Sequence, residues 1–155
     1  MTDFVIADLH FGDERVRASG RRQFADVCDM EEAIVRRWNQ RVSSTDTVYV
    51  LGDVGYAGSH ELIRGLNGTK HLVAGNCDRL GILIASRLFE TVSVVRRLPG
   101  ALLTHIPVHP SQLRGQCVNV HGHLHSLSLD DPRYRCVSVE QTGYAPLSLQ
   151  DLMVR

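Results

Sequence analysis

The sequence has no excess of charge of either sign, because 17 lysines and arginines are matched by 17 aspartates and glutamates. A balanced chain has no overall field that attracts nucleic acids or anionic membranes. It also has no apolar run near the roughly 18 residues that a membrane-spanning helix needs. We therefore expect no membrane partner and no strong nucleic-acid binding, and any affinity for a phosphate substrate has to come from a local site.

Paired cysteines and a leader segment are also missing. The four cysteines form no C-x-x-C pair, which argues against a zinc ribbon and against a disulfide scaffold. We interpret Cys28, Cys117 and Cys136 as small buried hydrophobic residues. The first apolar stretch ends after four residues and follows no basic segment, unlike a secretory signal peptide. These features predict a cytoplasmic protein, and they specify no oligomeric state.

The chain does contain enough apolar residues for one domain, since 43% of its 155 residues are hydrophobic. No repeat, low-complexity tract or linker divides it. Strand-like runs alternate with helical patterns in the first half, and the second half consists mainly of strands. This order predicts a single α/β domain over residues 1–155, with two sheets face to face and helices outside. The expected strands are 4–7, 47–51, 70–74, 92–98, 101–104, 117–120 and 136–139; residues 148–153 fit either a helix or a strand.

Three helices are expected, beginning near Asp29, Ser59 and Leu80. Asp29 is the expected cap of the first, with Glu32 reaching back at the third position. Segment 11–24 is interpreted as a loop with at most a short helix. Its arginines are interpreted as solvated; they are Arg15, Arg17, Arg21 and Arg22.

Three histidines lie within five residues in the segment Asn119-Val120-His121-Gly122-His123-Leu124-His125. In an extended segment, side chains two positions apart point to the same side, so these histidines can share a face. Neutral imidazole is the commonest metal ligand in proteins. Taken alone, the run fits either a metal-binding tract or a polar loop.

Further polar side chains stand where apolar strands end, at the edge of a sheet where function gathers in α/β proteins. Gly52 and Gly75 precede two of them, as expected where the backbone approaches closely. Together with His123 and His125, the five strand-end residues supply seven ligands, too many for one tetrahedral zinc. Seven suits two divalent transition-metal ions, and mixed oxygen and imidazole donors favour Mn, Fe, Zn or Ni, with Mn expected first. The strand-end residues are Asp8, His10, Asp53, Asn76 and His105.

The order of these residues resembles the calcineurin-like metallophosphoesterase superfamily, its short bacterial and phage members especially. Five ordered blocks are far more specific than any one of them. The resemblance implies a four-layer αββα sandwich, in which two mixed β-sheets are flanked by helices around a dinuclear site. The blocks are Asp8-Leu9-His10, Gly52-Asp53, Gly75-Asn76-Cys77-Asp78, His105 and Gly122-His123-Leu124-His125.

The resemblance also implies a role for each residue. Asn76, Cys77 and Asp78 form the catalytic segment, in which Asp78 would orient a neighbouring group or a water. The family usually has histidine where Cys77 stands, to protonate the leaving alkoxide; a thiol, with pKa near ~8.5, does this less well. We interpret Cys77 as a structural thiol rather than a nucleophile, and His109 or His121 as a replacement proton donor. Asp8, His10 and His125 would hold the first metal, Asn76, His105 and His123 the second, and Asp53 would bridge them.

We therefore expect a metal-dependent phosphoesterase that hydrolyses a small or exposed phosphate ester by attack of a metal-bridging hydroxide. Its Gly-Asn-Cys-Asp block is similar to that of members that look like phosphodiesterases, which favours diesters over monoesters. The alternative is a protein-binding scaffold that kept the fold and lost catalysis. The full set of ligands argues against it, and Cys77 argues for it. A zinc-stabilised nucleic-acid-binding module is disfavoured by the neutral charge.

Overall fold

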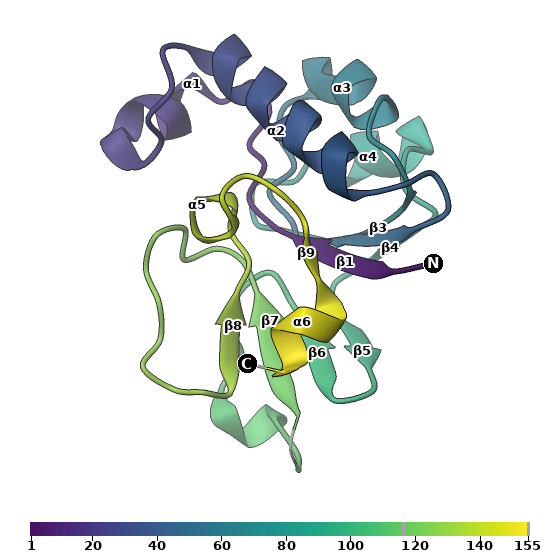
Figure 1. Ribbon diagram of the computed structural model, residues 1–155, viewed down its shortest axis with the longest axis vertical. Coiled ribbons are helices and arrows are strands. Elements are labelled where there is room, and N and C mark those ends of the chain that lie inside the picture. Colours follow the sequence, from purple (N-terminus) through teal and green to yellow (C-terminus); the bar gives the residue numbers. More distant parts are fainter. Residues whose placement is uncertain (116, 155) are drawn as a thin grey trace.

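The computed structural model describes residues 1–115 and 117–154, without the side chains of residues 20, 21 and 57. The fold is α/β, with two mixed sheets flanked by helices, which confirms the fold class expected from the sequence (Figure 1). No helix in the described part of the chain is both long and apolar enough to cross a membrane.

The first sheet has five strands in the order β4-β3-β2-β1-β9. Strands β1 to β4 are parallel to their neighbours, and β9 runs antiparallel to β1, which makes the sheet mixed. Because the parallel strands share a direction, the residues that follow them emerge at one edge. The strands are β1 (Asp3–Ile6), β2 (Thr47–Val50), β3 (Thr69–Val73), β4 (Thr91–Ser93) and β9 (Leu147–Ser148).

Helices cover the outer face of this sheet (Figure 1). The longest, α2 (Val27–Arg41), buries Met30, Ile34 and Trp38 at helical spacing against the sheet. Its cap is Asp26, not Asp29, because the Asp26 side chain accepts the Asp29 N–H at 2.8 Å, so the helix begins three residues earlier than expected. The shorter helices are α1 (Glu14–Val16), the π-helix η1 (Arg17–Arg21), the 3₁₀ helix η2 (Ala57–Ser59), α3 (His60–Arg64) and α4 (Leu80–Ser86).

The second sheet has four strands in sequence order. β6, β7 and β8 are parallel, and β5 pairs antiparallel with β6 through the turn at Pro99 and Gly100. Three short helices flank it, one of them carried by the loop that follows β6. The elements are β5 (Arg96–Leu98), β6 (Ala101–Leu103), β7 (Val118–His121), β8 (Tyr134–Cys136), η3 (Pro110–Gln112), α5 (Val139–Thr142) and α6 (Leu149–Val154).

Several expected elements differ from those observed. The strand expected over 92–98 is divided, since β4 belongs to the first sheet and β5 to the second, and the exposed residues Val94 and Val95 carry the chain between them. The strand expected over 136–139 ends at Cys136, and α5 begins at Val139, the last residue of the expected strand. Residues 148–153 were expected to form either a strand or a helix, and they contain both, the end of β9 followed by most of α6. Cys28 is exposed on α2, so its interpretation as a buried residue is wrong.

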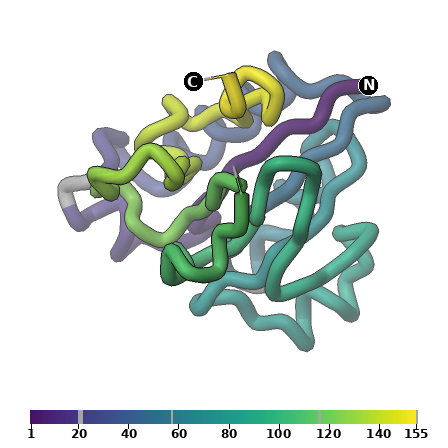
Figure 2. Tube along the Cα trace, turned by 90° about the horizontal axis from the view of Figure 1, so that it is seen from below, coloured from purple at the N-terminus to yellow at the C-terminus, as the bar shows by residue number. Residues whose placement is uncertain are grey.

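A hydrophobic core lies between the two sheets. Val5, Leu51 and Val73 of the first sheet face Leu103 and Val120 of the second, and each is at most 1% exposed. Helix α6 closes one side of this core beside β1, and Figure 2 shows α6 and the N-terminus along the same side of the molecule. This packing sets the ends of strands from both sheets around one common edge.

Candidate metal centre

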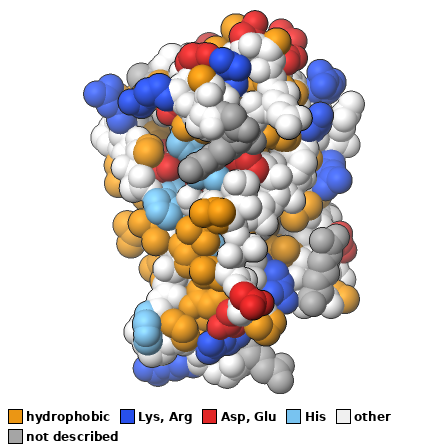
Figure 3. Space-filling view, turned by 90° about the vertical axis from the view of Figure 1, so that its left-hand side faces the viewer, with side chains coloured by type: hydrophobic (Ala, Val, Ile, Leu, Met, Phe, Trp, Pro, Cys, Tyr) orange, Lys and Arg blue, Asp and Glu red, His pale blue; other side chains and the backbone are white. Residues whose placement is uncertain are grey.

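The seven candidate ligands come together where strands of both sheets end. Most of them line a cavity of about 560 Å³, and Figure 3 shows histidine and acidic side chains together on one face of the molecule. The first sheet contributes ligands after β1, β2 and β3, and the second after β6 and β7. Asp8 and His10 follow β1, Asp53 follows β2, and Asn76 follows β3. His105 follows β6, and His123 and His125 follow β7.

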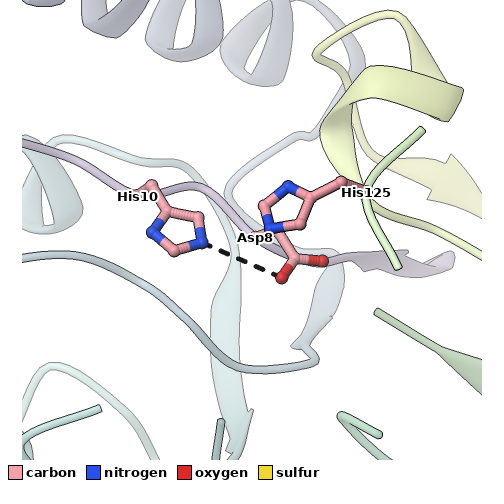
Figure 4. Close-up of side chains that lie close together, drawn as sticks. All are labelled: Asp8, His10 and His125. Carbon is pink, nitrogen blue, oxygen red and sulfur yellow. Dashed lines mark ion pairs between the residues drawn. The ribbon is translucent and has the colours of Figure 1, made fainter. Parts of the chain in front are cut away.

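Asp8, His10 and His125 form a first group, in which one ligand atom from each lies within 4.8 Å of the others (Figure 4). Asp8 is fully buried, and its Oδ2 accepts the Ser138 hydroxyl at 2.7 Å and the His123 N–H at 2.9 Å. Its Oδ1 and the Nε2 of His10 lie 4.0 Å apart, and both are buried without a hydrogen-bond partner. Buried polar atoms almost always have a partner. A cation between these atoms would satisfy both, so the residues fit a metal.

Asp8, Asp53 and His105 form a second group within the same distance. The Oδ2 of Asp53 lies 3.5 Å from the Nε2 of His105 and 3.6 Å from the Nε2 of His10. Asp53 thus lies between His10 and His105, which the resemblance assigns to different metals. The side-chain oxygen of Asn76 lies 2.9 Å from the Nε2 of His105. The His123 ring is 5.2 Å from that of His105 and lines the cavity, outside both groups.

The backbone at the candidate ligands is strained. Five of the seven have a positive φ, between 49° and 69°, and in the described part of the chain only two other non-glycine residues share this feature. The left-handed conformation costs such a residue roughly 1–2 kcal/mol. Strain of this kind persists where the surrounding structure imposes it, and it clusters at functional sites. The five are Asp8, His10, Asp53, His123 and His125.

Two glycines allow the turns to approach as closely as they do. A Cβ on Gly75 would lie 2.2 Å from the Oδ1 of Asp53, and one on Gly52 would lie 2.7 Å from the Nδ1 of His105. Neither distance is compatible with a side chain. Both positions therefore need glycine if Asp53 and His105 are to face each other.

The Asp78 carboxylate faces the backbone of its neighbours. It accepts N–H groups from Asp53 at 3.1 Å, Val54 at 2.9 Å and Gly75 at 2.8 Å, which occupies both of its oxygens. Asp78 therefore holds the turn that carries Asp53. It thereby orients a ligand loop, and its role toward a water or another neighbouring group stays a prediction.

Cys77 lines the cavity, and its backbone N–H donates to Asp53 at 2.8 Å. Partial burial and the nearby Asp53 carboxylate raise the pKa of the Cys77 thiol to about 11. The thiol therefore stays protonated at neutral pH. The two histidines considered as proton donors lie elsewhere: His121 is fully buried with its Nδ1 2.8 Å from the Gly122 carbonyl, and the exposed His109 caps η3. Neither lines this cavity.

Burial, helped by the charge of Arg22, lowers the pKa of His10 to about 4. Burial raises the pKa of Asp53, but the hydrogen bond and charge of His105 outweigh it, so the net pKa of Asp53 is low. At neutral pH, His10 is therefore neutral and Asp53 is ionised. These are the protonation states in which both side chains bind cations.

Sequence reasoning missed two buried residues behind the ligands. Arg22, interpreted as solvated, is only 2% exposed and binds Glu140, whose Oε1 lies 2.8 Å from the Nδ1 of His125. Arg22 is buried because it contacts the Asp8 turn and, through Glu140, His125. These are tertiary contacts, which a local sequence pattern does not show. Glu140 lies in the short helix α5, and no local pattern marks it.

Comparisons with known proteins support the fold. No protein-family model matches the sequence. An uncharacterized protein of Methanocaldococcus jannaschii is 29% identical over 164 residues, covering 98% of this chain and 89% of that protein. The crystal structure of a protein of unknown function from Aquifex aeolicus superposes with a TM-score of 0.74 at 21% identity, over 97% of both chains.

A conserved uncharacterized protein from Streptococcus pneumoniae, described as a predicted phosphoesterase, is 15% identical and covers 88% of this chain and 70% of its own. Its TM-score of 0.40 is too low to carry an argument. The Aquifex structure shows that the arrangement of two sheets is shared by a natural protein of similar size. The comparisons therefore support the two-sheet α/β fold of this chain.

Proposed function

We propose that this chain is a metal-dependent phosphoesterase whose seven candidate ligands hold two divalent ions. The observation that carries the proposal is the convergence of ligand atoms around Asp53, including the buried, unpaired atoms of Asp8 and His10, at an open cavity. Mixed carboxylate, amide and imidazole donors favour Mn, with Fe, Zn or Ni as alternatives. When bound, such ions polarise phosphoryl oxygens and lower the pKa of water, so that water supplies the attacking oxygen.

The cavity suits a small or exposed phosphate ester, because about 560 Å³ is within the size range of small-molecule sites. Arg15 and Ser19 also line it. The guanidinium of Arg15 is held by the Tyr56 hydroxyl and by Asp13, which lines the cavity as well. A guanidinium in this place binds phosphate oxygens well. We therefore assign substrate orientation to Arg15.

Phosphodiesters are the favoured substrates because the Gly-Asn-Cys-Asp block resembles that of members that look like phosphodiesterases, and Cys77 favours esters with good leaving groups. A general acid works best when its pKa lies near the working pH, and the pKa of this thiol is about 11. Esters whose leaving group departs without a proton lose least from that. The same feature keeps the protein-binding scaffold as the second candidate. The strained ligand turns argue for catalysis, because a scaffold gains nothing from that strain.

The test is hydrolysis of bis(p-nitrophenyl) phosphate and p-nitrophenyl phosphate by the metal-stripped protein before and after addition of Mn²⁺. We expect metal-dependent cleavage, faster for the diester. It should be lost in Asp53→Asn and retained in Asp131→Asn, a matched change on the surface. Two bound metals with no turnover of either ester would contradict the enzyme and favour the scaffold.

A further inference from the structure

We propose that Arg22 and Glu140 are positioning residues, a buried pair that sets the orientation of Asp8, His10 and His125 for metal binding. The inference rests on the proposed metal site and concerns residues outside the five sequence blocks. Neither side chain lines the cavity, so the pair acts only through the candidate ligands.

Glu140 fixes the ring of His125. Its Oε1 lies 2.8 Å from the Nδ1 of His125, and the Glu140 side chain is only 4% exposed. An ionised carboxylate only accepts, so Nδ1 carries the proton and donates. The other nitrogen, Nε2, is then the one with a free lone pair. Figure 4 shows the imidazole of His125 beside the Asp8 carboxylate. Histidines that ligate metals are commonly oriented by a carboxylate in this way.

Arg22 holds the opposite side of the same group. Its fully buried guanidinium donates through Nη1 to the Leu9 carbonyl at 2.9 Å and through Nη2 to the Asp8 carbonyl at 2.5 Å. These carbonyls belong to the turn in which Asp8 and His10 have positive φ. Its Nε donates to Glu140 at 2.8 Å. The planar fork of one guanidinium therefore ties the strained turn to the carboxylate that orients His125.

The bonding pattern differs from that of an ion pair that only stabilises the fold. Such a pair commonly uses both carboxylate oxygens against the guanidinium. Here the Oε1 of Glu140 accepts from both Arg22 and His125, while its Oε2 is buried without a partner. Arg22 and His125, the candidate metal ligand, therefore both donate to the same oxygen atom of Glu140. Positioning of His125 explains this geometry, and simple charge pairing does not.

The pair acts on one group of ligands. His105 is held separately, with its Nδ1 2.8 Å from the Leu51 carbonyl, and Asp53 is held by the turn that Asp78 clamps. Loss of the pair should therefore weaken metal binding most at the site of Asp8, His10 and His125, and less at the site of His105, which shares only Asp8 with it.

The experiment is titration of the metal-stripped protein with Mn²⁺ by calorimetry, using the double variant Arg22→Met/Glu140→Leu. Removing both charges together avoids an unpaired buried charge, and apolar replacement of a buried pair commonly preserves folding. We expect affinity at one of two sites to fall roughly 10- to 100-fold, with a smaller loss at the other. Arg22→Met/Glu140→Gln leaves no unpaired buried charge and keeps an oxygen for His125, so its affinity should lie between those of this double variant and the wild type. The control is Arg17→Met/Glu14→Leu, which removes an exposed pair of the same chemistry.

A second measurement needs no variant. Long-range ¹H–¹⁵N spectra of the metal-free wild type should show His125 protonated at Nδ1, and protonation at Nε2 would overturn the inference. So would a double variant that binds both ions as tightly as the wild type, since the pair would then be structural only. A wild type that binds no Mn²⁺ at all contradicts the proposed function instead, which keeps the two failures distinct.

Discussion

At the scale of single residues, the chemistry of the cavity depends on Cys77. The thiol is exposed to the cavity, next to Asn76 and joined to Asp53 through its backbone N–H. With a pKa of about 11, it neither attacks as a thiolate nor readily gives up a proton at neutral pH. An imidazole at this position would titrate near pH 6.5 and could protonate a leaving alkoxide.

We therefore predict that Cys77→His raises the hydrolysis rate of phosphate esters with poor leaving groups, by roughly 10²- to 10⁴-fold, the usual contribution of a general acid. The rate for bis(p-nitrophenyl) phosphate should change little, because p-nitrophenolate departs without a proton. Steady-state kinetics on alkyl and nitrophenyl esters measure the difference. Cys77→Ser is the control and should leave the ratio of the two rates as it is; an equal change for both ester types in Cys77→His would contradict the role.

Sequence patterns identify the residues that face the cavity and not those behind them. Asp8, His10 and Asp53 stand out because a polar residue directly after a buried strand is visible locally. Arg22 and Glu140 are 118 positions apart, and only the folded chain brings them together. Burial of an arginine beside a strained turn has no signature in a segment rich in glycine and charge, so Arg22 could not be distinguished there from its solvated neighbours.

At the scale of elements, the turns after β2 and β3 act as one unit. Asp78 accepts three backbone N–H groups from these turns, and a Cβ on Gly75 would collide with Asp53. Hydrogen bonds to a charged group contribute about 1.5–3 kcal/mol each when they are protected from water. Asp78 is only partly buried, so part of this is offset by solvent.

We predict that Asp78→Ala lowers the free energy of unfolding by about 2–4 kcal/mol in the presence of a chelator. It should also weaken Mn²⁺ binding, because Asp53 loses its fixed position. Asp78→Asn keeps one acceptor oxygen and should lie between the wild type and Asp78→Ala. Urea denaturation and metal titration measure the two effects. If Asp78→Ala binds Mn²⁺ like the wild type, the carboxylate does not position Asp53.

The elements themselves were predictable where the pattern is local. The helical stripe of Met30, Ile34 and Trp38 and the parallel strands of the first sheet agree with expectation. The division of the strand over 92–98 was not predictable, because Val94 and Val95 continue the β-branched run without glycine or proline. The division follows from pairing of β4 with β3 and of β5 with β6, which are long-range choices.

At the scale of the whole molecule, the candidate ligands come from both sheets. Asp8, His10 and Asp53 follow strands of the first sheet, and His105 and His125 follow strands of the second. The Asp8 carboxylate already accepts the His123 N–H from across the interface. Ions held by all of these residues would connect the two sheets at the edge where the core between them ends. Metal binding should therefore stabilise the fold as a unit and not one loop.

We predict that Mn²⁺ at about 100 times its dissociation constant raises the free energy of unfolding by about 2.7 kcal/mol for each site that it fills. For a chain of this length, that corresponds to an increase in Tm of about 5–10 °C per site. Hydrogen exchange should slow in β1 and β2 and also in β6 and β7, because ligands from both sheets must separate before the ions leave. A chelator should reverse both effects, and Asp53→Asn, which removes the central carboxylate charge, should show neither. Protection confined to one sheet would mean that the ions do not connect the two, and the ligand set would then have to be divided between separate, independent sites.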